Sequence, residues 1–127
     1  MAEVLGLWRA ILIMDKKLKA KWIKALKSGK YKKGDGALKK KVERRYTYCC
    51  LGVLCDIVNP NRWRKGDAKN NWDVNYKFES GEQDSGVIPD KDLDKLKIKY
   101  HDMRELIQIN DCCIDFKDVI TYIKTNL

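Results

Sequence analysis

The residues best suited to nucleophilic or metal chemistry are five cysteines and a single histidine. They are Cys49, Cys50, Cys55, Cys112, Cys113 and His101. A catalytic Cys–His pair would need one of these cysteines beside the histidine in the fold. Cys49, Cys50 and Cys55 instead lie in an apolar run, where thiols usually serve as small hydrophobic side chains. We therefore predict a protein that is not an enzyme and has no catalytic residues.

Metal and cofactor motifs are equally weak. Structural zinc sites favour cysteines that are separated by a few residues, whereas these pairs are adjacent. Asp90, Asp92 and Asp94 imitate the start of a calcium loop, but Lys95 and His101 stand where glycine and glutamate are needed. No glycine-rich phosphate-binding motif occurs. We predict no metal and no cofactor, with a meeting of the five thiols and His101 in space left as the alternative.

Positive charge is concentrated in the first part of the chain. The formal net charge is +9. Residues 1–70 hold 19 Lys and Arg against 6 Asp and Glu, whereas residues 71–127 hold 8 against 12. This asymmetry predicts a surface with positive potential that attracts phosphates. The alternative is a solubilising coat of lysines.

The basic residues gather in two segments. Residues 16–45 hold 14 Lys and Arg against Asp35 and Glu43, and Arg62-Trp63-Arg64-Lys65 follows. Arginine contacts phosphate in a bidentate way, and the faces of Trp63, Tyr31 and Tyr46 could stack on a base. Alternatively, Trp63 packs on the domain and the arginines stay hydrated. The predicted ligand-binding residues are Lys30, Tyr31, Lys32, Lys33, Lys39, Lys40, Lys41, Arg44, Arg45, Arg62, Trp63 and Arg64.

The length of 127 residues fits one domain, which we assign to residues 14–127 after an extension at residues 1–13. The apolar residues 2–14 are too few to span a bilayer, and positive charge follows them instead of preceding them as in a signal peptide. We predict that they begin a helix and that the protein has no membrane partner. A weak membrane-surface role stays open because four lysines follow directly. An odd number of cysteines without a secretion signal predicts a reduced, intracellular protein.

Hydrophobic periodicity predicts a mainly helical α+β domain with a small antiparallel sheet or hairpin. We expect three helices over residues 3–27, 49–58 and 90–97. A fourth helix should start at a capping box formed by Asp102 and Glu105, and a last helix should run from Asp115 to the end. Ser28-Gly29 and Asn59-Pro60 should end the first two. A short strand is expected at residues 42–48, with Val42, Arg44, Tyr46 and Tyr48 on one side, and the clearest strand at residues 72–78. Residues 30–41 and 61–71 read as loops, and Val87-Ile88 as the returning partner of the second strand.

Three stretches resemble a family of small, mostly uncharacterised proteins encoded by phages and prophages. They are Trp22-x-x-Ala25-Leu26-x-Ser28-Gly29-x-Tyr31, then Tyr48-Cys49-Cys50-Leu51-Gly52-Val53-Leu54-Cys55-Asp56, and Asn110-Asp111 with Phe116 five residues on. Lys33, Cys113 and Asp115 depart from the family pattern. The resemblance implies a phage origin, the cytoplasm of a host bacterial cell, and a role in host takeover or counter-defence. It carries no established active site.

Three functions fit these observations. The first is a non-catalytic counter-defence protein that binds a nucleotide signal or blocks the nucleotide- or nucleic-acid-binding site of a host immune component. A pocket for such a signal would need arginines and aromatic residues that converge on one cavity, helped by self-association into a homo-oligomer. The second is a DNA- or RNA-binding protein that contacts mainly the backbone. The third is a protein–protein adaptor with incidental charge, which would survive replacement of Lys39, Lys40, Lys41, Arg44 and Arg45 by serine.

Overall fold

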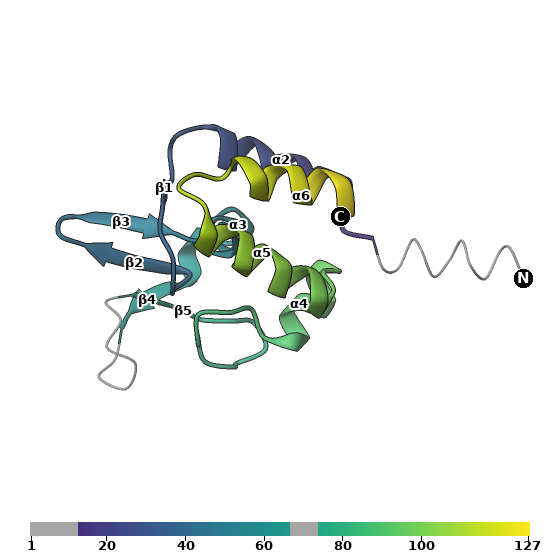
Figure 1. Ribbon diagram of the computed structural model, residues 1–127. Coiled ribbons are helices and arrows are strands. Elements are labelled where there is room, and N and C mark those ends of the chain that lie inside the picture. The colour runs from purple at the N-terminus through teal and green to yellow at the C-terminus, as the bar shows by residue number, and fades with distance from the viewer. Residues whose placement is uncertain (1–12, 67–73) are drawn as a thin grey trace, which may run out of the picture.

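Helices account for most of the regular structure in the computed structural model, which describes residues 13–66 and 74–127 (Figure 1). The helices are α2 (Lys16–Lys27), α3 (Cys50–Val58), α4 (Asp90–Leu96), α5 (Tyr100–Cys112) and α6 (Lys117–Asn126), with a 3-10 turn at Pro60–Arg62. The strands are β1 (Lys32–Lys33), β2 (Lys39–Val42), β3 (Arg45–Tyr48), β4 (Trp63–Lys65) and β5 (Val74–Tyr76). The predicted α+β class is confirmed. Within the described ranges, no helix has the length and apolar character needed to cross a bilayer.

Helix α3 lies at the centre of the fold, and the other long helices surround it. Residues 50–55 of α3 are all buried, which is why this segment is apolar on every side. Helices α2 and α5 pack on α3, while α6 runs alongside α2 and also contacts α5 (Figure 1). The side chains that fill this core include Trp22, Leu54, Leu106, Val119 and Ile123.

The backbone N–H and carbonyl of Cys50, at the start of α3, join three parts of the chain. The Trp22 Nε1–H donates to the Cys50 carbonyl at 2.9 Å, and the Cys50 N–H donates to Asn110 Oδ1 at 3.0 Å. The Asn110 amide in turn donates to the Gly34 carbonyl at 3.0 Å. Asn110 is fully buried, so its hydrogen bonds replace contacts that water would otherwise make. This network fixes α2, α5 and the residue that follows β1 against the first turn of α3.

Gly52 allows α3 to approach the strand region closely. A Cβ atom at this position would lie 1.7 Å from the carbonyl oxygen of Leu38, which is a backbone atom and cannot rotate away. Glycine is therefore required here for packing rather than for an unusual backbone angle. The contact holds the start of β2 against the buried helix.

Two small sheets complete the fold. The first has the strand order β1-β3-β2, with β1 parallel and β2 antiparallel to β3. The second pairs β4 with β5 in an antiparallel register that sets Trp63 opposite Tyr76 and Lys65 opposite Val74. Strand β2 also contacts β5, so the two sheets lie next to each other (Figure 1).

The prediction of loops at residues 30–41 and 61–71 was wrong in part. The first segment contains β1 and most of β2, and the second contains the 3-10 turn and β4. Lysine-rich sequences suit the edges of a sheet because charge discourages pairing with other chains, and β1 and β2 are the two edges of the first sheet. Residues 67–73, which include Trp72 of the predicted strand, lie outside the described residues, as do residues 3–12 of the predicted first helix.

The predicted strand over residues 42–48 is in fact the end of a hairpin. Val42 pairs with Arg45 across a two-residue turn, so Val42 and Arg44 do not share a strand face. Glu43 adopts a positive φ of 58° in this turn. Such turns usually contain glycine or asparagine, and the absence of either residue hid the hairpin.

The predicted pairing of Val87-Ile88 with the second strand was also wrong. The partner of β5 is β4, which precedes it in the chain. The carboxylate of Asp84 accepts the Tyr76 N–H at 2.9 Å and thereby occupies the backbone group that a returning strand would need. Ile88 instead enters the core, where it is 1% exposed.

Several helix boundaries are confirmed. Helix α2 ends at Ser28 with Gly29 at a φ of 75°, and α3 ends at Asn59 before Pro60. Asp115 accepts the N–H of Lys117 at the start of α6. The prediction that a capping box at Asp102 starts this helix was wrong, because α5 already begins at Tyr100. Asp102 is buried in its first turn and accepts the Tyr122 hydroxyl at 2.6 Å.

The Asn110 network leads to a stability prediction. Replacing Asn110→Ala leaves a buried N–H at Cys50 and a carbonyl at Gly34 without their partner. We expect the free energy of unfolding to fall by about 2–4 kcal/mol, measured by urea unfolding with circular dichroism. The matched control is Asn126→Ala, since Asn126 is exposed and also bonds one carbonyl; it should change stability by no more than about 0.5 kcal/mol. Equal losses in the two variants would contradict the role of Asn110.

Candidate functional site

A ladder of aromatic rings runs from the core to the surface across both sheets. The centroid distances are 5.0 Å for Phe78–Tyr76, 4.8 Å for Tyr76–Trp63, 6.3 Å for Trp63–Tyr48 and 4.9 Å for Tyr48–Tyr31. Every pair meets edge to face, the geometry that aromatic quadrupoles favour. Phe78 and Tyr76 are buried, whereas Trp63, Tyr48 and Tyr31 are half-buried. The buried rings therefore anchor a set of rings that reach solvent.

Asp56 holds two of these rings in place. Its Oδ1 accepts the Trp63 Nε1–H at 2.9 Å, and its Oδ2 accepts the Tyr31 hydroxyl. Burial, followed by the hydrogen bond to Asp56, raises the pKa of the Tyr31 hydroxyl, which keeps it protonated as a donor. The carboxylate thus explains why one acid interrupts the apolar run of α3: buried polar groups are hydrogen-bonded.

Lys39 places its ammonium among three aromatic rings, of which two belong to the ladder and the third is Tyr46. Its Nζ lies 4.6 Å from the Tyr46 centroid, 4.9 Å from that of Trp63 and 5.2 Å from that of Tyr48. These distances fall within the range of cation–π attraction. Burial lowers the pKa of Lys39 below its ordinary value of 10.5, and the charge of Asp56 opposes this shift. The ammonium is thus partly stripped of water and stabilised by rings and a nearby acid.

These residues border an open hollow of about 350 Å³, which we call the aromatic groove. It is lined by Lys39, Tyr46, Trp63, Arg64, Lys65 and Val74. Residues opposite each other in a sheet share a face, so the pairing Lys65–Val74 sets both beside Trp63, and Lys41 lies opposite Tyr46. Tyr46 is 44% exposed, so its ring is accessible from solvent. The arrangement combines accessible aromatic faces with cations, which suits a ligand that carries both bases and phosphates.

Some of the predicted ligand-binding residues meet in the aromatic groove. Lys39, Trp63 and Arg64 line it directly, and Lys41 shares the strand face of Lys39. Lys40 lies on the opposite face of β2 and pairs with Asp35 at 3.7 Å.

The remaining predicted residues are spread more widely. Lys30 approaches the Tyr31 ring at 5.7 Å, and Tyr31 itself forms the surface end of the ladder. Lys32 and Lys33 form β1, on the edge of the sheet away from β2. Arg44 and Arg45 are exposed at the hairpin turn. Arg62 lines a different cavity, beside Phe78 and Leu96. The basic segments therefore do not converge on one closed pocket.

Asp56 and Val74 belong to the site, and neither was among the predicted binding residues. A single acid in an otherwise apolar helix was the available signal for Asp56, because such a residue needs donors near it. Val74 carried no chemical signal, and it enters the groove only through the pairing of β5 with β4.

The thiols of α3 are poor nucleophiles. Burial raises the pKa of Cys49 to about 11 and raises the pKa values of Cys50 and Cys55 well above the ordinary value of 9. All three are buried, consistent with a packing role. Within residues 13–66 and 74–127, no cluster of three or more His, Cys, Asp or Glu side chains could hold a metal ion.

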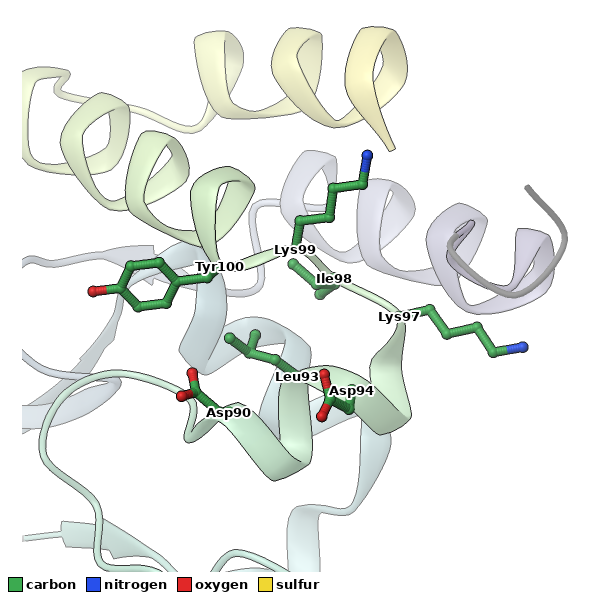
Figure 2. Close-up of a pocket in the computed structure, with 7 residues that line it drawn as sticks. All are labelled: Asp90, Leu93, Asp94, Lys97, Ile98, Lys99 and Tyr100. Atoms are coloured by element: carbon green, nitrogen blue, oxygen red, sulfur yellow. The ribbon is translucent and has the colours of Figure 1, made fainter. Parts of the chain in front are cut away.

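A second hollow, of about 760 Å³, lies where α4 leads into α5 (Figure 2). Leu93 and Ile98 face each other across its apolar floor. The polar ends of Lys97, Lys99 and Tyr100 point in different directions, and none meets another over the floor (Figure 2). Without convergent polar groups, this hollow is a weaker candidate than the aromatic groove.

Comparison with known proteins places the chain in a family. No curated protein and no solved structure matches it. One family model matches residues 14–127, which is nearly the whole chain. The chain therefore belongs to the family described as "Domain of unknown function (DUF8296)".

Proposed function

We propose that the aromatic groove binds single-stranded nucleic acid. Bases would stack on Tyr46 and Trp63, while the phosphates would contact Lys39, Arg64 and Lys65. The observation that carries the proposal is the ammonium of Lys39 among three aromatic rings on an open, basic surface. Stacking platforms bordered by cations are the usual means by which proteins hold single strands without reading sequence.

Lys39 supports the proposal through the interaction it already makes. In the free protein its ammonium is attracted to the faces of Tyr46, Tyr48 and Trp63. A phosphate offers a stronger partner than a ring does, because the charges are full and opposite. Moving the ammonium toward phosphate would expose the same ring faces to a base. One lysine would then couple phosphate contact to base stacking.

The shape of the groove favours a strand over a small nucleotide. Pockets for small molecules enclose most of the surface of their ligand. The aromatic groove is open, and Arg62 lies outside it. The guanidinium of Arg64 is held against its own backbone by bonds to the carbonyls of Asn61 and Trp63. An extended ligand that crosses the groove fits these features better than an enclosed one.

The resemblance to phage-encoded proteins suggests where such binding would matter. We propose that it serves counter-defence in the host bacterial cell, where a captured strand would be withheld from a host immune component. Binding of a nucleotide signal by the same groove is the competing version. Titration with a cyclic dinucleotide separates the two, since tighter binding of the dinucleotide than of a single strand would contradict the strand proposal.

Tyr46 provides a test of stacking. We expect Tyr46→Ala to weaken binding of a fluorescent oligothymidylate of about 12 nucleotides by roughly 5- to 150-fold, the equivalent of a stacking loss of about 1–3 kcal/mol. Fluorescence anisotropy at low salt measures the affinity. Tyr100→Ala is the matched control, because Tyr100 is 56% exposed and lies on α5, away from the groove. Equal losses in the two variants would show that stacking on Tyr46 does not contribute.

A substitution of Lys39 tests whether this residue both contacts phosphate and frees the ring faces for base stacking. With Lys39→Gln we expect weaker binding of the same oligonucleotide and a salt dependence of log K that is shallower by about 0.7. Lys40→Gln is the control, because Lys40 neighbours Lys39 on the same strand but faces Asp35. If Lys39 merely blocked the rings, Lys39→Gln would bind more tightly than the unaltered protein, and the proposed role would be wrong.

A further inference from the structure

A separate apolar cavity lies at the buried end of the ring ladder. It is enclosed by the end of α3, by β5 with the residues that follow it, and by α4. Its buried floor is formed by Cys55, Tyr76, Phe78 and Ile88, and Val58 and Leu96 form its walls. None of the residues that line the aromatic groove lines this cavity. It is therefore a second candidate site, independent of the proposed strand binding.

The size and lining of the cavity define an apolar guest. Its volume is about 150 Å³. An apolar cavity of roughly that volume stays free of water and accepts benzene. A phenyl or isobutyl group would therefore fill the space.

The charges at the rim define what such a guest should carry. The Lys95 ammonium pairs with Glu79 at 3.3 Å. Asp92 accepts the Ser80 hydroxyl at 2.6 Å and the Ser80 N–H at 3.4 Å. Four charged side chains surround the cavity, and three of them thus have partners: Lys95 and Glu79 pair with each other, and Asp92 accepts hydrogen bonds from Ser80.

Arg62 is the fourth charged side chain. Among residues 13–66 and 74–127, its guanidinium donates one hydrogen bond, to the Lys77 carbonyl at 3.1 Å, which holds it at the rim. In the described part of the chain, no carboxylate lies within ion-pair distance of it. The positive charge of Arg62 also acts on Tyr76, which belongs to the floor. Burial raises the pKa of the Tyr76 hydroxyl, and the nearby guanidinium opposes this shift. A half-buried guanidinium with several unused donors is well suited to a carboxylate.

We propose that this cavity binds a small apolar carboxylate, with a phenyl- or isobutyl-sized group on the floor and the carboxylate on Arg62. The same chemistry occurs in free aryl or alkyl acids and in the C-terminal residue of a peptide. Both sources present an apolar group close to a single carboxylate.

The test is a titration of the isotope-labelled protein followed by two-dimensional NMR. The probes are phenylacetate, its neutral counterpart phenylacetamide, and N-acetylphenylalanine, which imitates a peptide C-terminus. We expect phenylacetate to shift signals of Ile88, Leu96 and Phe78 and to bind about tenfold more tightly than phenylacetamide, because the amide lacks the negative charge and the second acceptor oxygen that a carboxylate presents to the guanidinium. Tighter binding of N-acetylphenylalanine than of phenylacetate assigns the site to peptide ends, and the reverse order assigns it to free acids.

Two variants link the binding to the cavity. Arg62→Gln should weaken phenylacetate about tenfold and leave phenylacetamide unchanged, since only the charged contact is removed. Arg64→Gln is the matched control, because Arg64 neighbours Arg62 in the chain but lines the aromatic groove; it should bind both probes like the unaltered protein. The proposal is overturned if phenylacetate and phenylacetamide bind equally well, if no signal from the cavity shifts up to the solubility limit, or if the two arginine variants behave alike. Binding of the oligonucleotide is expected to persist in Arg62→Gln, so failure here would not affect the proposed strand binding.

Discussion

The fold depends on how the buried start of α3 satisfies its backbone. The N-terminus of a helix leaves N–H groups without intrahelical partners, and water cannot supply partners for them in a core. Here the Cys50 N–H donates to Asn110 Oδ1, and the Trp22 indole N–H donates to the Cys50 carbonyl. Because Asn110 also donates to the Gly34 carbonyl, the backbone of Cys50 and the side chain of Asn110 together determine where α2, α5 and the end of the first strand lie. The positions of the sheets, and of the groove that lies on them, therefore depend on these hydrogen bonds.

These hydrogen bonds explain what the three sequence stretches do in the structure. Trp22, Cys50 and Asn110 belong to the three separate stretches that carry the family resemblance, and they meet at a single point of the core. Gly52, in the second stretch, is needed for the contact with Leu38. The set of three stretches therefore accounts for the scaffold. It does not by itself account for Lys39, Tyr46 or Arg64, which lie outside these stretches and project from strands at the surface.

The sequence predicted the parts of the fold that depend on local pattern. The apolar run of α3 and the stop signals at Gly29 and Asn59 are local, and the structure agrees with them. Strands β1, β2 and β4 were missed because their residues are lysines, arginines and a lone tryptophan. Only pairing with β3 or β5 makes them strands. For the same reason, the sequence identified Lys39, Trp63 and Arg64 as binding candidates, but it could not separate them from Lys40 or Arg62. The face on which each residue lies is decided by strand register and by contacts such as the Lys40–Asp35 pair.

Asp56 connects the core to the surface site and limits how the site can vary. Its two oxygens hold Trp63 and Tyr31, and its charge also acts on Lys39. Without this carboxylate, the indole would lose a partner for its N–H, and the ammonium would lose a negative charge that favours its partly buried position. The rings alone provide only a modest attraction for a cation at an exposed site. The acid in α3 and the lysine in β2 therefore act as one unit, in which the anion that holds two of the rings also stabilises the cation among the rings.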